Sequence, residues 1–413
     1  MGGFFYGRSQ QAALHRNPLR CNTELGLELR KIQKKFFDVG DGYLESCQQC
    51  HTNANHLLMS IVPKAPSLGP DTVPVPGHVL VMGAGAVGCY VGGCLQAVGV
   101  NVTFVGRPRV LDSLSQHGLC LSDLDGGHRT LAGLSLRLAS EIPIDTAPAL
   151  VLLTVKSAAT ARAASQLQSC LPAGTLVVSL QNGISNADVA RIAAPALHVV
   201  PGMVPYNIAE ISPGHFHRGT TGSLAAQAHP ALSTWLPWFK RALNPLTLHA
   251  DLVPVQWGKL LLNLNNPVNA LSGQPLRAQL LERGYRRILA ALMDEALDTL
   301  RCANIAPAKI TPITPIAPRW LPTLLRLPTP LFRVLAARML RMDDKARSSM
   351  ADDLTLNRVT EVDAMCGEIV RLATAQGRSA PLNNKMTALI QHWPIRREAM
   401  SAQALLVAMN LSK

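Results

Sequence analysis

The stretch His78-Val-Leu-Val-Met-Gly-Ala-Gly-Ala-Val-Gly88 decides the fold of this chain. A short apolar run leads into three glycines with the spacing G-x-G-x-x-G, and an amphipathic stretch, Cys89 to Val98, follows them. This order predicts a strand, a tight glycine turn and a helix, in which backbone N–H groups and the positive helix end face a pyrophosphate. A plain structural turn is the alternative. The residues of the predicted dinucleotide site are Gly83, Ala84, Gly85, Ala86, Val87 and Gly88.

The next predicted strand, Asn101-Val-Thr-Phe-Val-Gly-Arg107, indicates which cofactor the site would take. Its end lies roughly twenty residues beyond the glycines, where a dinucleotide fold meets the adenosine ribose. An acidic residue there would accept hydrogen bonds from the 2′-hydroxyl of NAD, but this chain has Arg107 and, after a proline, Arg109. Since a guanidinium suits a 2′-phosphate, the sequence favours NADP(H). The alternative is a solvated arginine at a strand end.

Length and composition allow two domains and sizeable cores, since the chain has 413 residues and is 48% hydrophobic. The formal net charge of +13 is spread along the chain, with seven Lys/Arg against two Asp between Arg319 and Arg347. That segment fits the solvated face of a helix, or else a surface that touches a membrane or nucleic acid. The aromatic content of 4% disfavours base-stacking platforms. We expect neither a nucleic acid nor a membrane as partner.

The nine cysteines show no disulfide-like pattern, and neither a signal sequence nor a run of eighteen apolar residues is visible. These features predict a cytoplasmic protein with reduced thiols. Cys47-Gln-Gln-Cys50-His51 matches the C-x-x-C-H haem attachment signature, but such attachment requires export. We expect residues 1–76 to be an irregular, poorly ordered extension, or to include sequence upstream of a start at Met59. No other His, Cys and carboxylate cluster has ligand spacing, so we expect no metal.

Alternating strand and helix patterns from His78 to about Ala250 predict an α/β, Rossmann-like dinucleotide-binding domain over residues 77–250. Continuous apolar runs, such as Ala149–Lys156 and Thr175–Gly183, are typical of strands buried on both faces of a parallel sheet. Ligands of such sheets bind at the carboxyl ends of the strands. The residues expected at those ends are Gly83, Arg107, Lys156 and Asn182.

The pattern between these strands predicts smaller elements. The expected elements are a helix over Leu111–Gly118, a hairpin over Leu119–Ala139 that turns at Asp125-Gly126-Gly127, a helix over Thr160–Cys170 and a strand over His198–Val204.

From Asp251 onward the pattern is helical, and we expect an all-α C-terminal substrate domain over residues 251–413, with a cleft between the two domains. A proline-rich insert, residues 305–330, interrupts it. The predicted helices are Val255–Ala270, Arg277–Ala303, Leu331–Met342 and Thr355–Gln376.

The first of these helices carries unusual polar residues. Lys259, Asn263 and Asn266 recur at i, i+4 and i+7 among leucines, so they share one helix face. A buried polar group without a partner costs roughly 1–3 kcal/mol. This face therefore forms either a polar network between helices or a cleft surface that binds a polar substrate. Partial burial would also lower the pKa of Lys259 and make it a better proton donor near neutral pH.

A second polar stretch runs from Arg347 to Asp363. Two serines precede a predicted helix that has Asp352 and Asp353 in its opening turns, so Ser348 or Ser349 is expected as its N-cap. Glu361 follows Arg358 by one helical turn, and its simplest role is a surface ion pair.

Together these motifs resemble those of the 2-dehydropantoate 2-reductases, also called ketopantoate reductases. The resemblance runs from His78 to about Trp393. The motifs that carry it are G-A-G-A-V-G, Val155-Lys156, Leu180-Gln-Asn-Gly183, Trp257-Gly-Lys259 with Asn263, Ser348-Ser-Met350, Thr360-Glu-Val-Asp363 and Ala380-Pro-Leu-Asn383.

The resemblance implies NADPH-dependent reduction of 2-dehydropantoate to pantoate, a step toward pantothenate and coenzyme A. It implies that Lys259 is the proton donor and that Glu361 keeps this lysine oriented and charged. It implies substrate binding by the amide of Asn263 and by Ser349, which would hold the substrate carboxylate. Lys156 and Asn182 would line the nicotinamide side of the cleft.

The chain departs from the family pattern at three places. Pro267 stands where the family has a second asparagine, so Asn266, or failing that Asn269, would supply that amide. Asn357 replaces a glycine, and Cys366-Gly367 replaces Asn-Gly. Because these changes put the substrate in question, another 2-oxo acid or ketone is the first alternative. A non-catalytic NADPH-binding module and a haem-bearing fusion are the others, and the assembly expected is a monomer or a homodimer.

Overall fold

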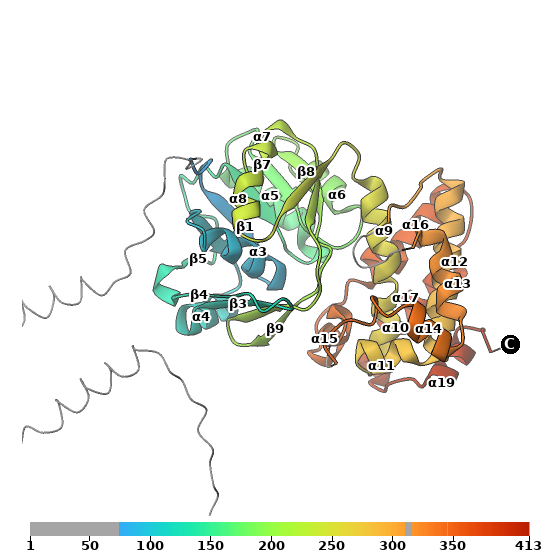
Figure 1. Ribbon diagram of the computed structural model, residues 1–413. Helices are drawn as coiled ribbons and strands as arrows, with labels where there is room; N and C mark the ends of the chain where they lie inside the picture. The colour runs from blue at the N-terminus through green and yellow to red at the C-terminus, as the bar shows by residue number, and fades with distance from the viewer. Residues whose placement is uncertain (1–73, 310–315, 345, 413) are drawn as a thin grey trace, which may run out of the picture. The chain divides into compact units, whose positions relative to one another are not determined.

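The computed structural model describes residues 74–309, 316–344 and 346–412 (Figure 1). The C-x-x-C-H segment, Met59 and nearly all of the expected extension lie outside these residues, as does part of the proline-rich insert. Strands occur only in the blue-to-yellow part of the described chain, and the part that follows them contains helices alone (Figure 1).

The first part is built on an eight-stranded sheet. All neighbouring strands are parallel except β8 and β11, which run antiparallel. In spatial order the strands are β12 (Leu246–His249), β11 (Leu224–Gln227), β8 (His198–Met203), β7 (Leu176–Ser179), β6 (Leu150–Leu153), β1 (Val79–Met82), β2 (Val102–Val105) and β5 (Arg137–Ala139).

Every residue of the four central strands β7, β6, β1 and β2 is buried, so both faces of the sheet are covered. Successive side chains of a strand point to opposite faces. In β1, Val79 and Val81 join the core with α3 (Ala86–Gln96), whereas Leu80 and Met82 join the core on the other face. That second face is covered by α5 (Thr160–Cys170) and α6 (Asn186–Ala193). This layering explains why the central strands read as continuous apolar runs.

A second, four-stranded sheet lies against α3. Its hairpin of β3 and β4 turns at Asp125-Gly126-Gly127, as the sequence predicts. In spatial order its strands are β4 (His128–Leu131), β3 (Leu119–Asp123), β10 (His215–Arg218) and β9 (Ile208–Ser212). The remaining helices of this part are α4 (Pro108–His117), α7 (Pro230–Ser233), α8 (Leu236–Arg241) and the 3-10 turns η1 (Gly133–Ser135) and η2 (Ser157–Ala159).

The second part packs its helices around one large apolar core centred on α12. Its helices are α9 (Val253–Asn263), α10 (Asn265–Ser272), α11 (Leu276–Leu281), α12 (Arg283–Cys302), η3 (Pro318–Trp320), α13 (Leu321–Arg326), α14 (Thr329–Leu335), α15 (Ser349–Thr355), η4 (Val362–Ala364), α16 (Cys366–Ala375), α17 (Pro381–Gln391), α18 (Trp393–Arg396) and α19 (Ala402–Ala408). The predicted fold class, an α/β domain followed by an all-α domain, is confirmed.

The prediction of one helix over Val255–Ala270 is wrong, because the chain breaks at Leu264 between α9 and α10. Pro267 explains the break: its ring clashes with the carbonyl of the residue four positions earlier, which is Asn263. Lys259 and Asn263 therefore lie on α9, and Asn266 lies on the following helix.

The helix expected over Arg277–Ala303 is also divided, at Glu282, into α11 and α12. The side chain of Arg286 is fully buried beside this break. Its guanidinium donates to the carbonyl oxygens of Leu280, at 2.8 Å, and of Leu325, at 3.0 Å. It thus satisfies carbonyl groups that a helix end leaves without intrahelical partners.

The helix predicted over Thr355–Gln376 is wrong as well. Helix α15 ends at Thr355 and α16 begins at Cys366, and the segment between them is irregular apart from the 3-10 turn η4. Asn357 has a φ of +50°, the left-handed conformation that commonly ends a helix and that asparagine tolerates. The unwinding removes Glu361 from a helix surface. The helix expected over Leu331–Met342 likewise stops at Leu335, as α14.

No helix in the described parts of the chain is long and apolar enough to cross a lipid bilayer.

Candidate active site

The glycine turn between β1 and α3 has the shape that the sequence predicts. Gly83 has a φ of +114°, which favours glycine. A Cβ on Gly88 would lie 2.2 Å from the Gly83 carbonyl oxygen, so this glycine allows helix and turn to pack together. A Cβ on Gly85, in contrast, would meet nothing within 4 Å. Gly85 therefore borders open space at the start of α3, whose first turn carries no acidic residue.

Arg107 follows β2 and is the N-cap residue of α4, with an exposed side chain. The preceding residue, Gly106, packs against the glycine turn, since a Cβ there would lie 2.7 Å from the Cβ of Ala84. The end of β2 thus lies directly beside the turn. The exposed guanidinium of Arg107 is available to a ligand held there.

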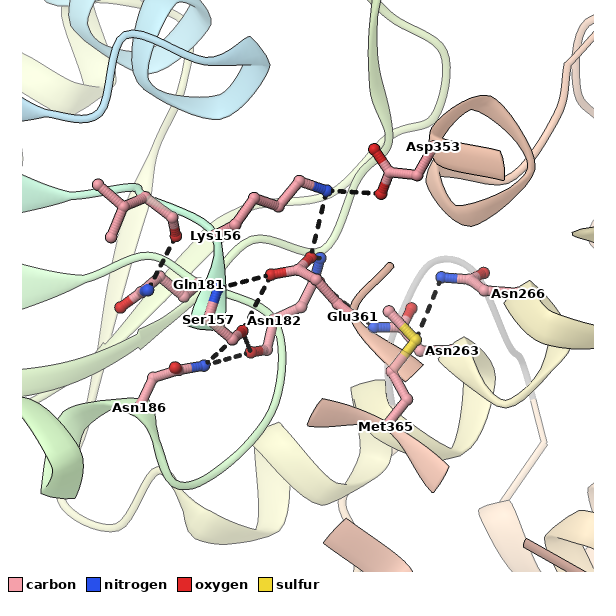
Figure 2. A network of polar contacts seen from close by, with 11 residues as sticks. Lys156, Ser157, Gln181, Asn182, Asn186, Asn263, Asn266, Asp353, Glu361 and Met365 are labelled. Carbon is pink, nitrogen blue, oxygen red and sulfur yellow. Dashed lines mark hydrogen bonds and ion pairs between the residues drawn. The ribbon is translucent and has the colours of Figure 1, made fainter. Parts of the chain in front are cut away.

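A polar network connects the sheet to the helical part of the molecule (Figure 2). Lys156, at the end of the segment after β6, places its Nζ 2.8 Å from Oδ2 of Asp353 in α15 and 3.6 Å from Oε2 of Glu361. Burial lowers the pKa of Lys156, but the two carboxylates outweigh it and leave the pKa above its ordinary value. The lysine is therefore a stable ammonium ion.

Glu361 is the centre of this network. Ser157 donates its backbone N–H at 3.0 Å and its hydroxyl at 2.9 Å to Oε1 of Glu361. Asn182, after β7, donates its amide at 3.1 Å to Oε2 (Figure 2). The glutamate is 9% exposed and so is no surface partner of Arg358, which corrects the simpler expectation. A buried carboxylate with three such donors and a nearby ammonium is held firmly in place.

Lys259 lies elsewhere in the site. Its Nζ donates to the carbonyl oxygen of Pro205 at 3.0 Å, and burial lowers its pKa to about 8. The expectation that Glu361 orients Lys259 is not met in this structure, because its carboxylate instead accepts hydrogen bonds from Ser157 and Asn182 at the carboxyl ends of the central strands. The two residues connect indirectly, since Asn263, one turn beyond Lys259, donates its amide to Oδ1 of Asn182 at 3.4 Å.

The remaining expected residues lie around the start of α15. Ser348 is the N-cap, and its hydroxyl accepts a hydrogen bond from the Ala351 N–H. Ser349 is half-buried, and no hydrogen bond from its hydroxyl is found among the described residues. Asn266 places its amide nitrogen 3.7 Å from Sδ of Met365 (Figure 2). Asn269 is fully buried and accepts from the backbone N–H of Ser348, a structural role that makes it a poor substitute for a substrate-binding amide.

The sequence analysis missed two members of the network, Ser157 and Asp353. Ser157 follows directly after Lys156 at a strand end, which was a usable signal. The sequence pattern places Asp353 only in the opening turns of a helix, because its pairing with Lys156 joins residues 197 positions apart. Asn186 and Gln181 support the same edge: Asn186 donates to the Asn182 carbonyl oxygen, and Gln181 donates to that of Val155.

Family models match both parts of the chain. Ketopantoate reductase PanE/ApbA matches residues 79–231, and the C-terminal model of the same family matches residues 251–393. The chain belongs to the ketopantoate reductase family. This family consists of oxidoreductases that act on a ketone, and the resemblance drawn from the sequence motifs is confirmed.

The matches to relatives in this family span nearly the whole length of each relative. The 2-dehydropantoate 2-reductase of Pyrococcus horikoshii is 24% identical over 76% of this chain and 96% of its own. A PanE/ApbA family ketopantoate reductase structure from Ralstonia eutropha has a TM-score of 0.64 at 26% identity, covering 78% of this chain and 99% of its own. A D-mandelate dehydrogenase solved with NADH and anilino(oxo)acetate is 18% identical with a TM-score of 0.61, covering 76% of this chain and 97% of its own, so it shows the shared fold.

Proposed function

We propose that this ketopantoate reductase family member reduces 2-dehydropantoate to pantoate with NADPH. The observation that carries the proposal is the meeting of α9 with the sheet edge: Lys259 has a lowered pKa, and Asn263 contacts Asn182. These elements bring an acid and two amides together beside the carboxyl ends of the strands, where ligands of such sheets bind.

The chain offers a place for the cofactor. Gly85 borders open space, so a pyrophosphate can approach the backbone at the positive end of α3. The residues proposed to hold it are Gly83, Ala84, Gly85, Ala86, Val87, Gly88 and Arg107, with Lys156 and Asn182 near the nicotinamide. When bound, NADPH would supply the hydride, while the protein supplies position, charge and protons.

Lys259 is proposed as the proton donor to the substrate oxygen. With a pKa of about 8, its amine is mostly protonated at neutral pH yet gives up its proton more easily than an ordinary lysine. The ammonium also stabilises negative charge as it develops on the carbonyl oxygen. The residues proposed to bind the substrate are Asn263, Asn266 and Ser349. Ser349 would hold the carboxylate of the substrate. Glu361 is proposed to act through Asn182, whose amide it fixes for the contact with Asn263.

The direct test measures NADPH consumption with 2-dehydropantoate and identifies the product. We expect pantoate in a one-to-one ratio with oxidised NADPH. The alternative is that the substrate is another 2-oxo acid or ketone. A panel of other 2-oxo acids, run in the same assay, tests it, and aryl 2-oxo acids are included because one structural neighbour is a D-mandelate dehydrogenase. Binding of NADPH without turnover on any of these ketones would contradict the proposal and indicate a non-catalytic binding module.

Sizing chromatography distinguishes monomer from homodimer; one relative, from Staphylococcus aureus, is described as dimeric.

The preference for NADPH is tested at Arg107. Replacing Arg107 by Asp is expected to raise KM for NADPH about 10- to 100-fold, because charge-assisted hydrogen bonds to the 2′-phosphate are lost and repulsion replaces them. The KM for NADH should change far less. Arg162→Asp, the same change at another exposed arginine, on α5, is the control for net charge. Equal losses for both cofactors would contradict the assignment of Arg107 to the 2′-phosphate.

A further inference from the structure

The ion pair between Lys156 and Asp353 joins an exposed group to a buried one. The Lys156 side chain is 51% exposed, whereas that of Asp353 is 6% exposed. Asp353 makes the shorter of the two carboxylate contacts to this ammonium (Figure 2). The distance from Lys156 Nζ is 2.8 Å to Oδ2 of Asp353 and 3.6 Å to Oε2 of Glu361. The lysine can therefore move toward solvent or a ligand, while the carboxylate of Asp353 stays in place.

The three groups together carry a formal charge of −1, because two carboxylates face one ammonium. Such a cluster repels an anion as long as the ammonium is engaged by both carboxylates. A 2-oxo acid carries a carboxylate at neutral pH. Its binding beside this cluster is favoured when Lys156 turns from one of its two partners toward the new anion.

Asp353 is the partner placed to compete with a substrate. It follows Ser349 by four positions in α15, so the two side chains project from the same face of the helix. Ser349 is the residue proposed above to receive the substrate carboxylate. Lys156 therefore already reaches the helix face at which that carboxylate would be bound.

We propose that Asp353 is a specificity-determining residue whose carboxylate competes with the carboxylate of a 2-oxo acid for the ammonium of Lys156. This inference rests on the proposed function. Binding of the substrate replaces an internal anion by an external one at the same ammonium. Asp353 thus weakens the binding of every carboxylate substrate by a constant factor and leaves neutral ketones unaffected.

The test compares Asp353→Asn with wild type in steady-state assays. The amide keeps the shape of the side chain and removes its charge, so Lys156 is more available to the substrate. We expect KM for 2-dehydropantoate to fall about threefold to fivefold, the modest size expected for a half-exposed ion pair. The KM for the neutral methyl ester of 2-dehydropantoate should stay unchanged.

Asp352→Asn is the matched control. It makes the same charge change one residue earlier in α15, where the carboxylate interacts electrostatically with Arg347, Arg358 and Lys156 but is not an ion-pair partner of Lys156 among the described residues. An equal fall of KM in this control, a fall for the ester as well, or an unchanged or raised KM in Asp353→Asn would overturn the inference. In a Lys156→Gln background, Asp353→Asn should have no further effect on KM. If Asp353→Asn does not fold, Asp353→Ser gives the same comparison.

Calorimetric titration of each variant with 2-dehydropantoate separates this inference from the proposed function. Tighter binding in Asp353→Asn without any turnover by the wild type would support the competition and contradict the reductase proposal. Normal turnover by the wild type with equal affinities in all variants would do the reverse. Absence of measurable binding in every variant, together with absence of turnover by the wild type, would overturn both.

Discussion

Replacement of Lys259 by methionine is expected to lower kcat for 2-dehydropantoate reduction about 10²- to 10⁴-fold, the usual contribution of a positioned acid. The Kd for NADPH should not change, because Lys259 contacts the Pro205 carbonyl and not the glycine turn. Stopped-flow measurement of NADPH oxidation and fluorescence titration of NADPH give the two values. Full turnover in this variant would remove Lys259 from the mechanism.

The pH dependence of the wild type provides an independent check on the same residue. Reduction needs the protonated amine, so kcat should be constant at neutral pH and fall as the pH rises through about 8. Oxidation of pantoate needs the neutral amine and should rise through the same range. A limb near the ordinary lysine value of 10.5 would contradict the burial of this group.

The variant should also be more stable at neutral pH. The folded protein holds Lys259 with a pKa below its value in the unfolded chain, so the unfolded state binds more protons between about pH 8 and 10.5. Folding thus carries an electrostatic cost that is fully present below pH 8 and disappears as the pH rises to 10.5. Lys259→Met removes this cost, which is about 3 kcal/mol for a lowering of the pKa from 10.5 to about 8. It also removes the hydrogen bond to Pro205, so the free energy of unfolding at pH 7 should rise by about 1–2 kcal/mol. The exposed Lys240, replaced by methionine, is the control for charge.

Gly88 of α3 and Gly85 of the turn before it should differ in their response to replacement by alanine, the first losing stability and the second losing NADPH affinity. Gly88→Ala places a Cβ 2.2 Å from a backbone oxygen that cannot move without displacing the turn. We expect a loss of about 2–4 kcal/mol in the free energy of unfolding, in the range of severe overpacking. Urea unfolding followed by circular dichroism measures it.

Gly85→Ala is the matched substitution. Its Cβ meets nothing within 4 Å and its φ of −98° suits any residue, so stability should change by less than about 0.5 kcal/mol. The methyl group instead occupies the space proposed for the pyrophosphate, and the Kd for NADPH should rise at least about tenfold. Unchanged NADPH affinity in Gly85→Ala would mean that the dinucleotide does not approach this turn.

The fold was largely predictable because its signals are local. Apolar runs marked the central strands, and the glycine spacing marked the turn before α3. Two of the helix boundaries that failed share a cause: single residues, Pro267 at one break and Asn357 at another, overrode a helical pattern that continued on both sides. Periodicity alone does not distinguish a continuous helix from two helices in line.

The candidate site was predictable by membership but not by pairing. Lys156, Asn182, Asn263 and Glu361 do come together, yet the partner expected for Glu361 was Lys259. Which carboxylate meets which ammonium depends on how α15 and the segment after it lie against the strand ends. That arrangement depends on the unwinding at Asn357, which helical periodicity does not indicate, although the family pattern has a glycine at this position.

Glu361 and Glu368 share a feature with consequences for ligand exchange. Each extends from the helical part to a serine at the sheet edge and accepts both its backbone N–H and its hydroxyl, Glu361 from Ser157 and Glu368 from Ser185. Hydrogen bonds of this kind can be replaced by hydrogen bonds to water at a small net cost in free energy, whereas the exposure of apolar surface to water is unfavourable. Ile184 of the first part also packs against the helical core, and Val255 of α9 packs against Met203 and Ala225 of the sheet, so any parting of the two halves for ligand exchange has to expose apolar surface as well as these two polar contacts.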